Sequence, residues 1–271
     1  VFIGSLDPNP KNHGRGIRAL RKAGIQAAGG ILSSEVQKQN EAFFKYARTG
    51  LPFVTLKMAQ SLDGKIATQR GLSRWISSEA ARDFVHRLRG EQDAILVGTN
   101  TLLRDDPLLS PRFHSKGLRQ QGKPWRVVLD ARFKVSPTAR IFRGEQITVI
   151  AISEKIFKTP TAKTKRFKGN CIVLPVAEQQ GHLDLEHLLK QLGSLGIAKL
   201  LVEGGGETAW SFLDARLVDK FYWIIAPKFL GGAQAKTSVE GAGVRLPSQA
   251  IRPKSLKCKP LGEDWLFEGE F

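Results

Sequence analysis

The sequence predicts an α/β fold, with a mostly parallel central sheet covered by helices on both faces. Two observations lead to this class. Short apolar strands alternate with amphipathic helices from residue 51 to residue 227, and strands that are apolar throughout are typical of a sheet buried on both sides. The last residues, 254–271, have the pattern of a hairpin around Gly262, which predicts an antiparallel C-terminal edge.

The first predicted elements of this sheet are a strand at 53–59 and a helix at 77–90. The helix has a serine N-cap, Glu79 in its first turn, where the helix dipole favours an acid, and Gly90 as an expected stop. The further strands are expected at 93–98, 126–130, 148–153, 171–175, 199–205 and 219–227. The further helices are expected at 99–106, 183–196 and 207–217.

Residues 1–50 differ in character from the rest. They predict a helix led by glycine, a short strand and a second helix, which is too little to enclose a hydrophobic core. The sequence also starts at Val1 rather than at methionine. We therefore expect two parts, 1–50 and 51–271, and a chain that begins inside a larger parent protein.

Composition excludes several classes of protein. The chain has 271 residues, 41% of them apolar and 25% charged, as in ordinary folded proteins. No run of 18 apolar residues is present and the N-terminus does not have the pattern of a signal peptide, so we expect a cytoplasmic protein that is not in a membrane. Cys171 and Cys258 lie far apart without paired spacing, which argues against a disulfide framework and against a zinc site.

The net charge of +17 raises the alternative of a nucleic-acid-binding module. Much of the positive excess lies between Arg112 and Lys168, in irregular sequence without RNA-binding aromatic motifs. Such a region is more often a solvated surface, or a field that attracts small anions. Two roles for this basic region remain open: it attracts phosphorylated ligands, or it only keeps the protein soluble.

Polar residues gather where three predicted strands end, which is where open α/β sheets bind ligands. The first group follows the strand at 53–59. Lys57 lies in an apolar strand, and Ser61, Asp63 and Gly64 form a turn beyond it. A lone lysine in such a strand has an ordinary explanation as an edge-strand or snorkelling residue, and the turn has one as a simple loop.

The second and third groups follow the strands at 93–98 and 199–205. In the second, Thr99 and Thr101 offer hydroxyl groups, while Asp105 and Asp106 lack the further carboxylates that a magnesium site needs. In the third, residues 204–206 are three glycines between a strand and a helix, so successive N–H groups can bind a phosphate. The turn has neither the GxGxxG nor the Walker A pattern, and a tight connection is the alternative.

Together these segments identify a family. The sequences TLKMAQSLDGKIAT, SRWIS, ILVGTNTLLRDDP, LLSPR, LVEGGGETAWSFLDARLVD and APKFLGG resemble, over residues 51–271, the reductase domain of the bifunctional riboflavin-biosynthesis deaminase/reductase. The resemblance implies a dihydrofolate-reductase-like fold and an oxidoreductase that uses NADPH. It also implies reduction of 5-amino-6-(5-phosphoribosylamino)uracil to 5-amino-6-(5-phosphoribitylamino)uracil, with hydride added to the ribose C1′.

The segment 1–50 resembles the end of that family's cytidine-deaminase-like domain. Zinc deaminases hold their metal with H-x-E and P-C-x-x-C motifs. This sequence contains neither motif, so zinc is expected only in a part of the parent protein outside this chain. The resemblance therefore implies a parent that is also a pyrimidine deaminase, whereas deamination is not expected of this chain.

The resemblance also assigns roles to residues that match the family's motifs. The expected catalytic residues are Lys57 and Asp105. The expected cofactor-binding residues are Ala59, Trp75, Thr101, Asp105, Gly205, Gly206, Glu207, Thr208, Ala209, Trp210 and Ser211. The expected substrate-binding residues are Ser73, Arg89, Leu109, Arg112 and Glu203. One departure from the family is Ala131, where a serine can face the cofactor.

Three alternatives remain at this point. The first is a reductase of the same fold that acts on the aminated 2,5-diamino-6-ribosylamino-pyrimidinone phosphate or on a folate, although the deaminase-like segment weighs against it. The others are a nucleic-acid-binding module and an inactive fragment. The expected partner is a small phosphorylated pyrimidine, with no nucleic acid, and the apolar C-terminal strands favour a homodimer. Arg132 and Ser153 are candidates for a 2′-phosphate pocket, and the sequence does not choose between them.

Overall fold

The computed structural model describes residues 1–110, 123–159, 167 and 169–271. The chain splits into two compact units, and each is considered by itself. The larger unit contains residues 54–188 and 199–271, and the smaller contains residues 1–53 and 189–198.

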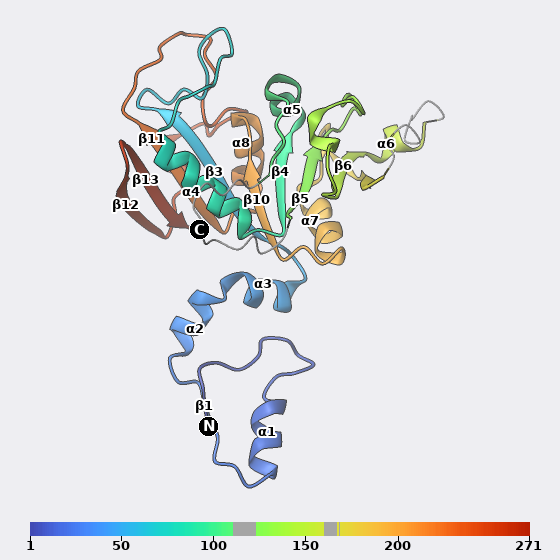
Figure 1. Cartoon of the computed structure of the whole chain (residues 1–271), viewed down its shortest axis with the longest axis vertical. Helices are drawn as coiled ribbons and strands as arrows, with labels where there is room; N and C mark the ends of the chain where they lie inside the picture. The colour runs from blue at the N-terminus through green and yellow to red at the C-terminus, as the bar shows by residue number, and fades with distance from the viewer. Residues whose placement is uncertain (111–122, 160–166, 168) are drawn as a thin grey trace. The chain divides into compact units, whose positions relative to one another are not determined.

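Within the described residues, the larger unit is built on a nine-stranded sheet with the order β12-β13-β11-β3-β10-β4-β5-β6-β7 (Figure 1). The pairs β11–β3, β10–β4, β4–β5, β5–β6 and β6–β7 are parallel, whereas β13 is antiparallel to both β11 and β12. The strands are β3 (Phe53–Ser61), β4 (Ala94–Gly98), β5 (Trp125–Leu129), β6 (Thr148–Ser153), β7 (Cys171–Val176), β10 (Lys199–Glu203), β11 (Lys220–Ala226), β12 (Ser255–Leu261) and β13 (Asp264–Glu270). The predicted α/β class, with its antiparallel edge, is confirmed.

Helices cover both faces of this sheet; Figure 1 shows α4 (Glu79–Gly90) and α8 (Gly206–Asp214) on opposite sides of it. Successive side chains of a strand point to opposite faces of the sheet. Because both faces are covered at β4, all of its residues are apolar and buried. Ile95 and Val97 pack with Leu88 of α4, whereas the intervening Leu96, also fully buried, points to the other face. The remaining elements are α5 (Thr99–Asp105), η1 (Arg140–Phe142), α6 (Glu154–Phe157), β8 (Glu178–Gln179), β9 (His182–Leu183), α7 (Leu185–Ser194) and η3 (Pro247–Gln249).

One predicted helix end is confirmed and another is wrong. α4 ends at Gly90 as expected, and Glu91 is its C-cap with φ −92°. The expected helix at 183–196 begins only at Leu185, because Leu183 pairs in the short β8–β9 hairpin. Asp184 then accepts a hydrogen bond from the N–H of His187 at 3.0 Å, which satisfies a free donor of the first turn.

The smaller unit contains β1 (Phe2–Ile3), α1 (Arg15–Lys22), β2 (Ala28–Gly29), α2 (Ser33–Gln39) and α3 (Glu41–Thr49). The sequence predicts one helix after β2, whereas the structure has two. They are separated at Asn40, whose side-chain amide donates to the carbonyl of Val36 at 2.9 Å and so ends α2. The hydroxyl of Tyr46 donates to the carbonyl of Gly193 at 2.8 Å, and a Cβ at Gly193 would lie 1.9 Å from the carbonyl oxygen of Gly50.

A search of the helices in the described ranges finds none with the length and apolar character needed to span a bilayer.

Candidate active site

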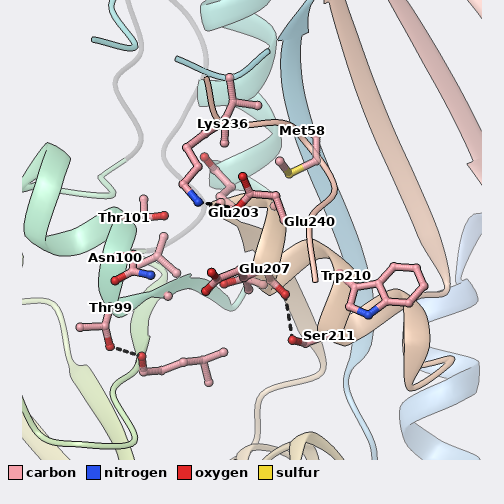
Figure 2. Close-up of a pocket in the computed structure, with 18 of the residues that line it drawn as sticks. Met58, Thr99, Asn100, Thr101, Glu203, Glu207, Trp210, Ser211, Lys236 and Glu240 are labelled. Carbon is pink, nitrogen blue, oxygen red and sulfur yellow. Dashed lines mark hydrogen bonds and ion pairs between the residues drawn. The ribbon is translucent and has the colours of Figure 1, made fainter. Parts of the chain in front are cut away.

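An open cavity of about 1590 Å³ lies in the larger unit, lined by residues at or beyond the carboxyl ends of β3, β10, β4 and β5. Sites for drug-sized ligands are typically about 300–1,000 Å³, so this one is large enough for a dinucleotide and a second small molecule. Figure 2 shows Thr99, Asn100 and Thr101, from the first turn of α5, on one side and residues of α8 on the other. The parallel strands therefore bring together segments that lie far apart in the sequence.

The cavity contains a cluster of three charged side chains from three elements. Glu203 ends β10 and is 8% exposed, and both of its oxygens accept from Arg89 of α4, at 2.6 Å from Nε and 2.7 Å from Nη2. Lys57 lies on the neighbouring strand β3, which has β11 on its other side. An edge-strand explanation of Lys57 is therefore wrong, because β3 is an interior strand.

Electrostatics in this cluster act in opposite directions on its members. Burial lowers the pKa of Lys57, the charge of Glu203 raises it, and Arg89 lowers it, with a net decrease from the usual 10.5. Burial raises the pKa of Glu203, but Arg89, Lys57 and His86 together hold that pKa below its usual 4.5. The cations around it therefore hold Glu203 as an anion. Its charge in turn raises the pKa of Lys57, against the lowering effect of burial.

The glycine turn between β10 and α8 lines the cavity. Gly205 is the N-cap of α8 and provides no side-chain cap, so the first turn of α8 has free backbone donors at the positive end of the helix dipole. Gly98 has no room for a side chain, because a Cβ there would lie 2.5 Å from Oγ1 of Thr208. This close approach brings the start of α5 next to the start of α8.

A loop at 236–240 forms another wall of the cavity near α8. The N–H of Glu240 donates to the carbonyl of Gly206 at 3.1 Å, and a Cβ at Gly206 would lie 2.5 Å from the carbonyl oxygen of Thr237. Glu240 pairs with Lys236 at 3.3 Å (Figure 2). Sequence reasoning missed this wall, because the loop has no motif and lies about 30 residues after the glycine turn.

The turn after β3 has a structural explanation. The carboxylate of Asp63 accepts from the Ser61 hydroxyl and from the N–H groups of Gly231 and Leu230, and these bonds lower the pKa of Asp63 to about 2. The N–H of Ser238 donates to the carbonyl of Gly64 at 3.2 Å. The SLDG segment therefore attaches the 228–240 region to the end of β3.

Asp105 of α5 lines the cavity and contacts residues of the segment 73–74. The hydroxyl of Ser73 approaches a carboxylate oxygen of Asp105 at 3.4 Å, and Arg74 donates to the Asp105 carbonyl at 3.3 Å. Trp75 is 65% exposed, and the guanidinium of Arg82 lies 4.5 Å from the centre of its ring. A large aromatic face is thus held at the cavity by a cation.

All of the predicted site residues that the structure describes line this cavity except Ala209. Ala209 is 1% exposed, and its N–H donates within α8 to the carbonyl of Gly205. Arg112 lies outside the described residues. The individual roles of these residues stay predictions.

The cavity also contains residues that sequence reasoning did not assign. They include Asn100, Arg104, Asp130, Lys134, Lys236, Glu240 and the segment 179–186. The sequence could have pointed to Asp130 and Lys134, because both follow the strand VVL and residues at the carboxyl ends of parallel strands bind ligands. The segment 179–186 has no such signal, because its position depends on the β8–β9 hairpin.

Nothing among the described residues suggests a metal site. No group of three or more His, Cys, Asp and Glu side chains within them has the arrangement to hold a metal ion. Cys171 and Cys258 are free, and burial raises the pKa of Cys171 to about 11, which disfavours the thiolate that binds metals.

The fold and the cavity define a nicotinamide-dependent oxidoreductase domain with a dihydrofolate-reductase-like architecture. The chain belongs to the RibD C-terminal domain family, whose model matches residues 52–267. It is a reductase of riboflavin biosynthesis.

Relatives along the whole chain support this assignment. The chain is 37% identical over 272 residues to the riboflavin biosynthesis protein RibD of Actinobacillus pleuropneumoniae, covering 99% of this chain and 70% of that protein. It is 36% identical to RibD of Aquifex aeolicus, with 97% and 70% covered.

Solved structures are similar as well. The structure of Acinetobacter baumannii RibD matches with a TM-score of 0.85 at 29% identity, covering 100% of this chain and 72% of that one. The deaminase/5-amino-6-(5-phosphoribosylamino)uracil reductase of Thermotoga maritima matches with a TM-score of 0.81 at 30% identity, covering 100% and 70%. The riboflavin biosynthesis reductase Rib7 of Saccharomyces cerevisiae, at 20% identity and a TM-score of 0.63, shares the fold.

Replacing Arg89 with methionine is expected to destabilise the protein by about 3 kcal/mol at pH 7, because it leaves the buried Glu203 carboxylate without its main partner. A carboxyl group whose pKa is lowered by folding stabilises above its unfolded value of 4.5 and loses that contribution as the pH falls. The difference between variant and wild type should therefore shrink near pH 4. Urea unfolding at both pH values measures it.

The matched control is Arg87→Met, an exposed arginine on the same helix. It should change the free energy of unfolding by less than about 0.5 kcal/mol. Equal effects of the two variants at pH 7 would contradict a special role for the pair.

Proposed function

We propose that this chain uses NADPH to reduce 5-amino-6-(5-phosphoribosylamino)uracil to 5-amino-6-(5-phosphoribitylamino)uracil. The observation that carries the proposal is the Lys57–Glu203–Arg89 cluster in the same cavity as the open N-terminus of α8. A proton donor and an anion-binding turn are the two things that the reduction of a phosphorylated ribosylamine with a dinucleotide requires. The reductase named in the Thermotoga structure acts on this uracil, which favours it over the aminated pyrimidine.

The residues present fit a nicotinamide dinucleotide. Its pyrophosphate would be held by the N–H groups at 205–207, with the hydroxyl of Thr101 beside them, since a Cβ on Gly205 would lie 3.8 Å from Oγ1 of Thr101. Its nicotinamide end would lie towards Ala59 and Trp75. When bound, the nicotinamide supplies the hydride that the ribose C1′ accepts.

Lys57 is the proton donor of this proposal. When the ribosylamine opens, the bond between C1′ and the ring oxygen breaks, a C=N bond forms, and the ring oxygen takes a proton from the Lys57 ammonium. The nitrogen keeps its own hydrogen in the iminium ion that forms, so hydride addition to C1′ completes the amine without a second proton, and Lys57 regains its proton from water. The charge of Glu203 raises the pKa of Lys57 and so favours its ammonium form, and the carboxylate of Asp105 is a second group that can guide a proton.

The test is oxidation of NADPH, followed by its absorbance, with the deaminated substrate and with the aminated precursor in parallel. We expect turnover with the deaminated compound and at least tenfold lower kcat/KM with the precursor, a difference of about 1.4 kcal/mol in transition-state binding. Preference for the precursor would contradict the proposed substrate. No oxidation with either compound would contradict the proposed activity of this chain.

Lys57→Met is expected to lower kcat by about 100-fold or more, the usual contribution of a positioned general acid. The control is Lys65→Met, a partly buried lysine that contacts the carbonyl of Ala235 and does not line the cavity. It should keep near wild-type turnover. If Lys57→Met retained full kcat at saturating substrate, the lysine would have only a structural role.

The pH profile gives a second measurement on the same residue. A required ammonium makes kcat/KM fall as the pH rises through the Lys57 pKa, which lies below 10.5 in the folded protein. Glu203→Gln removes the charge that raises this pKa, so the alkaline limb should move to lower pH. If the alkaline limb did not move in Glu203→Gln, a group other than Lys57 would be responsible for the fall in kcat/KM.

We also propose that the chain acts as a homodimer in the cytoplasm. β12 forms the outer edge of the sheet, and six of its seven residues are exposed, so its backbone is open to another strand. Leu256 and Trp265 on this hairpin are at least half exposed. Free thiols at Cys171 and Cys258 fit a reducing compartment.

Light scattering after size-exclusion chromatography should give about twice the 29.9 kDa mass of the chain. Leu256→Lys places a charge on the exposed hairpin and should shift the protein towards the monomer. A wild-type mass equal to one chain would contradict the dimer.

A further inference from the structure

The segment 67–77 joins the turn after β3 to the start of α4, and several of its residues line the cavity. Within the described residues, its backbone–backbone hydrogen bonds form a local turn. The N–H of Gly71 donates to the carbonyl of Thr68 at 2.8 Å, and the N–H of Thr68 donates to the carbonyl of Leu72 at 2.9 Å. Neither bond joins the segment to the sheet, so its position in the cavity depends on contacts that involve side chains.

Trp75 is the largest side chain of this segment, and it lies at the cavity with 65% of its surface exposed. Tryptophan is largely buried in most proteins, so an indole left open at a cavity is typical of a group that contacts a ligand. An open ring on a weakly attached segment loses conformational freedom when a ligand binds to it. A contact that orders this ring in advance therefore makes ligand binding tighter.

Arg82 of α4 contacts both the ring and the backbone of the segment. Its guanidinium lies 4.5 Å from the centre of the Trp75 ring, and its Nη1 donates to the carbonyl of Ser77 at 2.8 Å. A cation at this distance from an indole is attracted by the π electrons of the ring. Arg82 also lines the cavity, although sequence reasoning assigned no role to it.

The start of α4, which carries Arg82, is attached to the sheet. Ser78 is the N-cap of α4, and its hydroxyl oxygen accepts from the N–H of Ala81 at 3.3 Å. Asp264 of β13 accepts in turn from the N–H of Ser78 at 2.7 Å and from its hydroxyl at 2.8 Å. Arg82 therefore reaches Trp75 from a rigid base.

Two other cations near Trp75 are less suited to orient the ring. Arg74 lies 6.0 Å from the ring centre, belongs to the same segment, and donates to the carbonyl of Asp105 at 3.3 Å. The ammonium of Lys228 donates to the main-chain carbonyl of Trp75 at 3.3 Å, so this bond holds the backbone rather than the indole. Arg82 is therefore the contact that orients the ring from a rigid element outside the segment.

We propose that Arg82 is a positioning residue that holds the indole of Trp75 ready for the nicotinamide ring of the cofactor, and that it acts on this end of the cofactor alone. This inference rests on the proposed NADPH-dependent reduction, in which the nicotinamide end lies towards Ala59 and Trp75. Because Arg82 orders the indole in advance, less conformational entropy is lost when the nicotinamide binds. The phosphates, at the β10–α8 turn, do not depend on this contact.

The first measurement observes the ring directly. Protein that contains 5-fluorotryptophan has one fluorine NMR signal for each of its five tryptophans, and Trp75→Phe identifies the signal of Trp75. Arg82→Gln should move that signal by more than its linewidth towards its position in the unfolded protein, because the indole loses its cation and gains contact with water. Arg82→Lys keeps a cation on the helix and should move it less. A Trp75 signal that stays in place in Arg82→Gln would overturn the inference.

The second measurement is calorimetric binding of NADPH, without a second substrate, and of 2′-phospho-ADP-ribose, which has the same phosphates and lacks the nicotinamide. Wild type should bind NADPH more tightly; equal affinities would overturn the inference, because the nicotinamide would then contribute nothing. Arg82→Gln should weaken NADPH binding by about fivefold or more and change binding of the second compound by less than about twofold. Unchanged NADPH binding, or equal weakening of both compounds, would overturn the inference too.

The control is Arg87→Gln, which removes the same charge from an exposed position on α4 that does not line the cavity. It should leave the fluorine signal of Trp75 and both affinities unchanged. Wild type that binds neither compound would overturn the proposed function together with the nicotinamide part of this inference. The fluorine measurement distinguishes that result from a failure of the contact between Arg82 and Trp75, because it needs no bound ligand.

Discussion

The arrangement of the cavity depends on one carboxylate, that of Glu203 at the end of the central strand β10. A charge in this position is stable only when it is paired, and the two-fold contact with Arg89 connects the sheet to α4 at the point where the cavity opens. The same negative charge raises the pKa of Lys57 on the adjacent strand, against the larger lowering effect of burial. One side chain therefore joins the sheet to α4 and also acts on the pKa of the neighbouring lysine.

A second constraint is the close approach of backbone segments around the start of α8. Gly98 and Gly206 each lie against another segment with no space for a Cβ, on opposite sides of the turn that would hold a phosphate. These contacts fix the free N–H groups relative to β4 and to the loop at 236–240. The turn proposed to bind phosphate is therefore fixed by contacts with two other segments, which would preorganise it for a ligand.

The fold could be predicted because its signals are local. Apolar strands, the cap at Ser78 and the turn at Gly262 act within a few residues of where they appear. The site could be predicted only in part. Residues that follow strands were found by that position, whereas Lys236, Glu240 and the segment 179–186 reach the cavity through tertiary contacts that leave no sequence pattern. Whether Lys57 lies on an edge strand or on an interior strand also depends on the order of the strands in the sheet, and the hydrophobic periodicity of the sequence does not reveal that order.

The interior position of Lys57 has a consequence for how the domain fails. β3 has a neighbour on each side, so its backbone cannot shift without breaking two ladders of hydrogen bonds. A catalytic group on a loop can be displaced by local fluctuation while the remaining structure persists. The proposed proton donor Lys57 lies instead on an interior strand, so we expect turnover to be lost together with global unfolding and to report on the population of folded molecules.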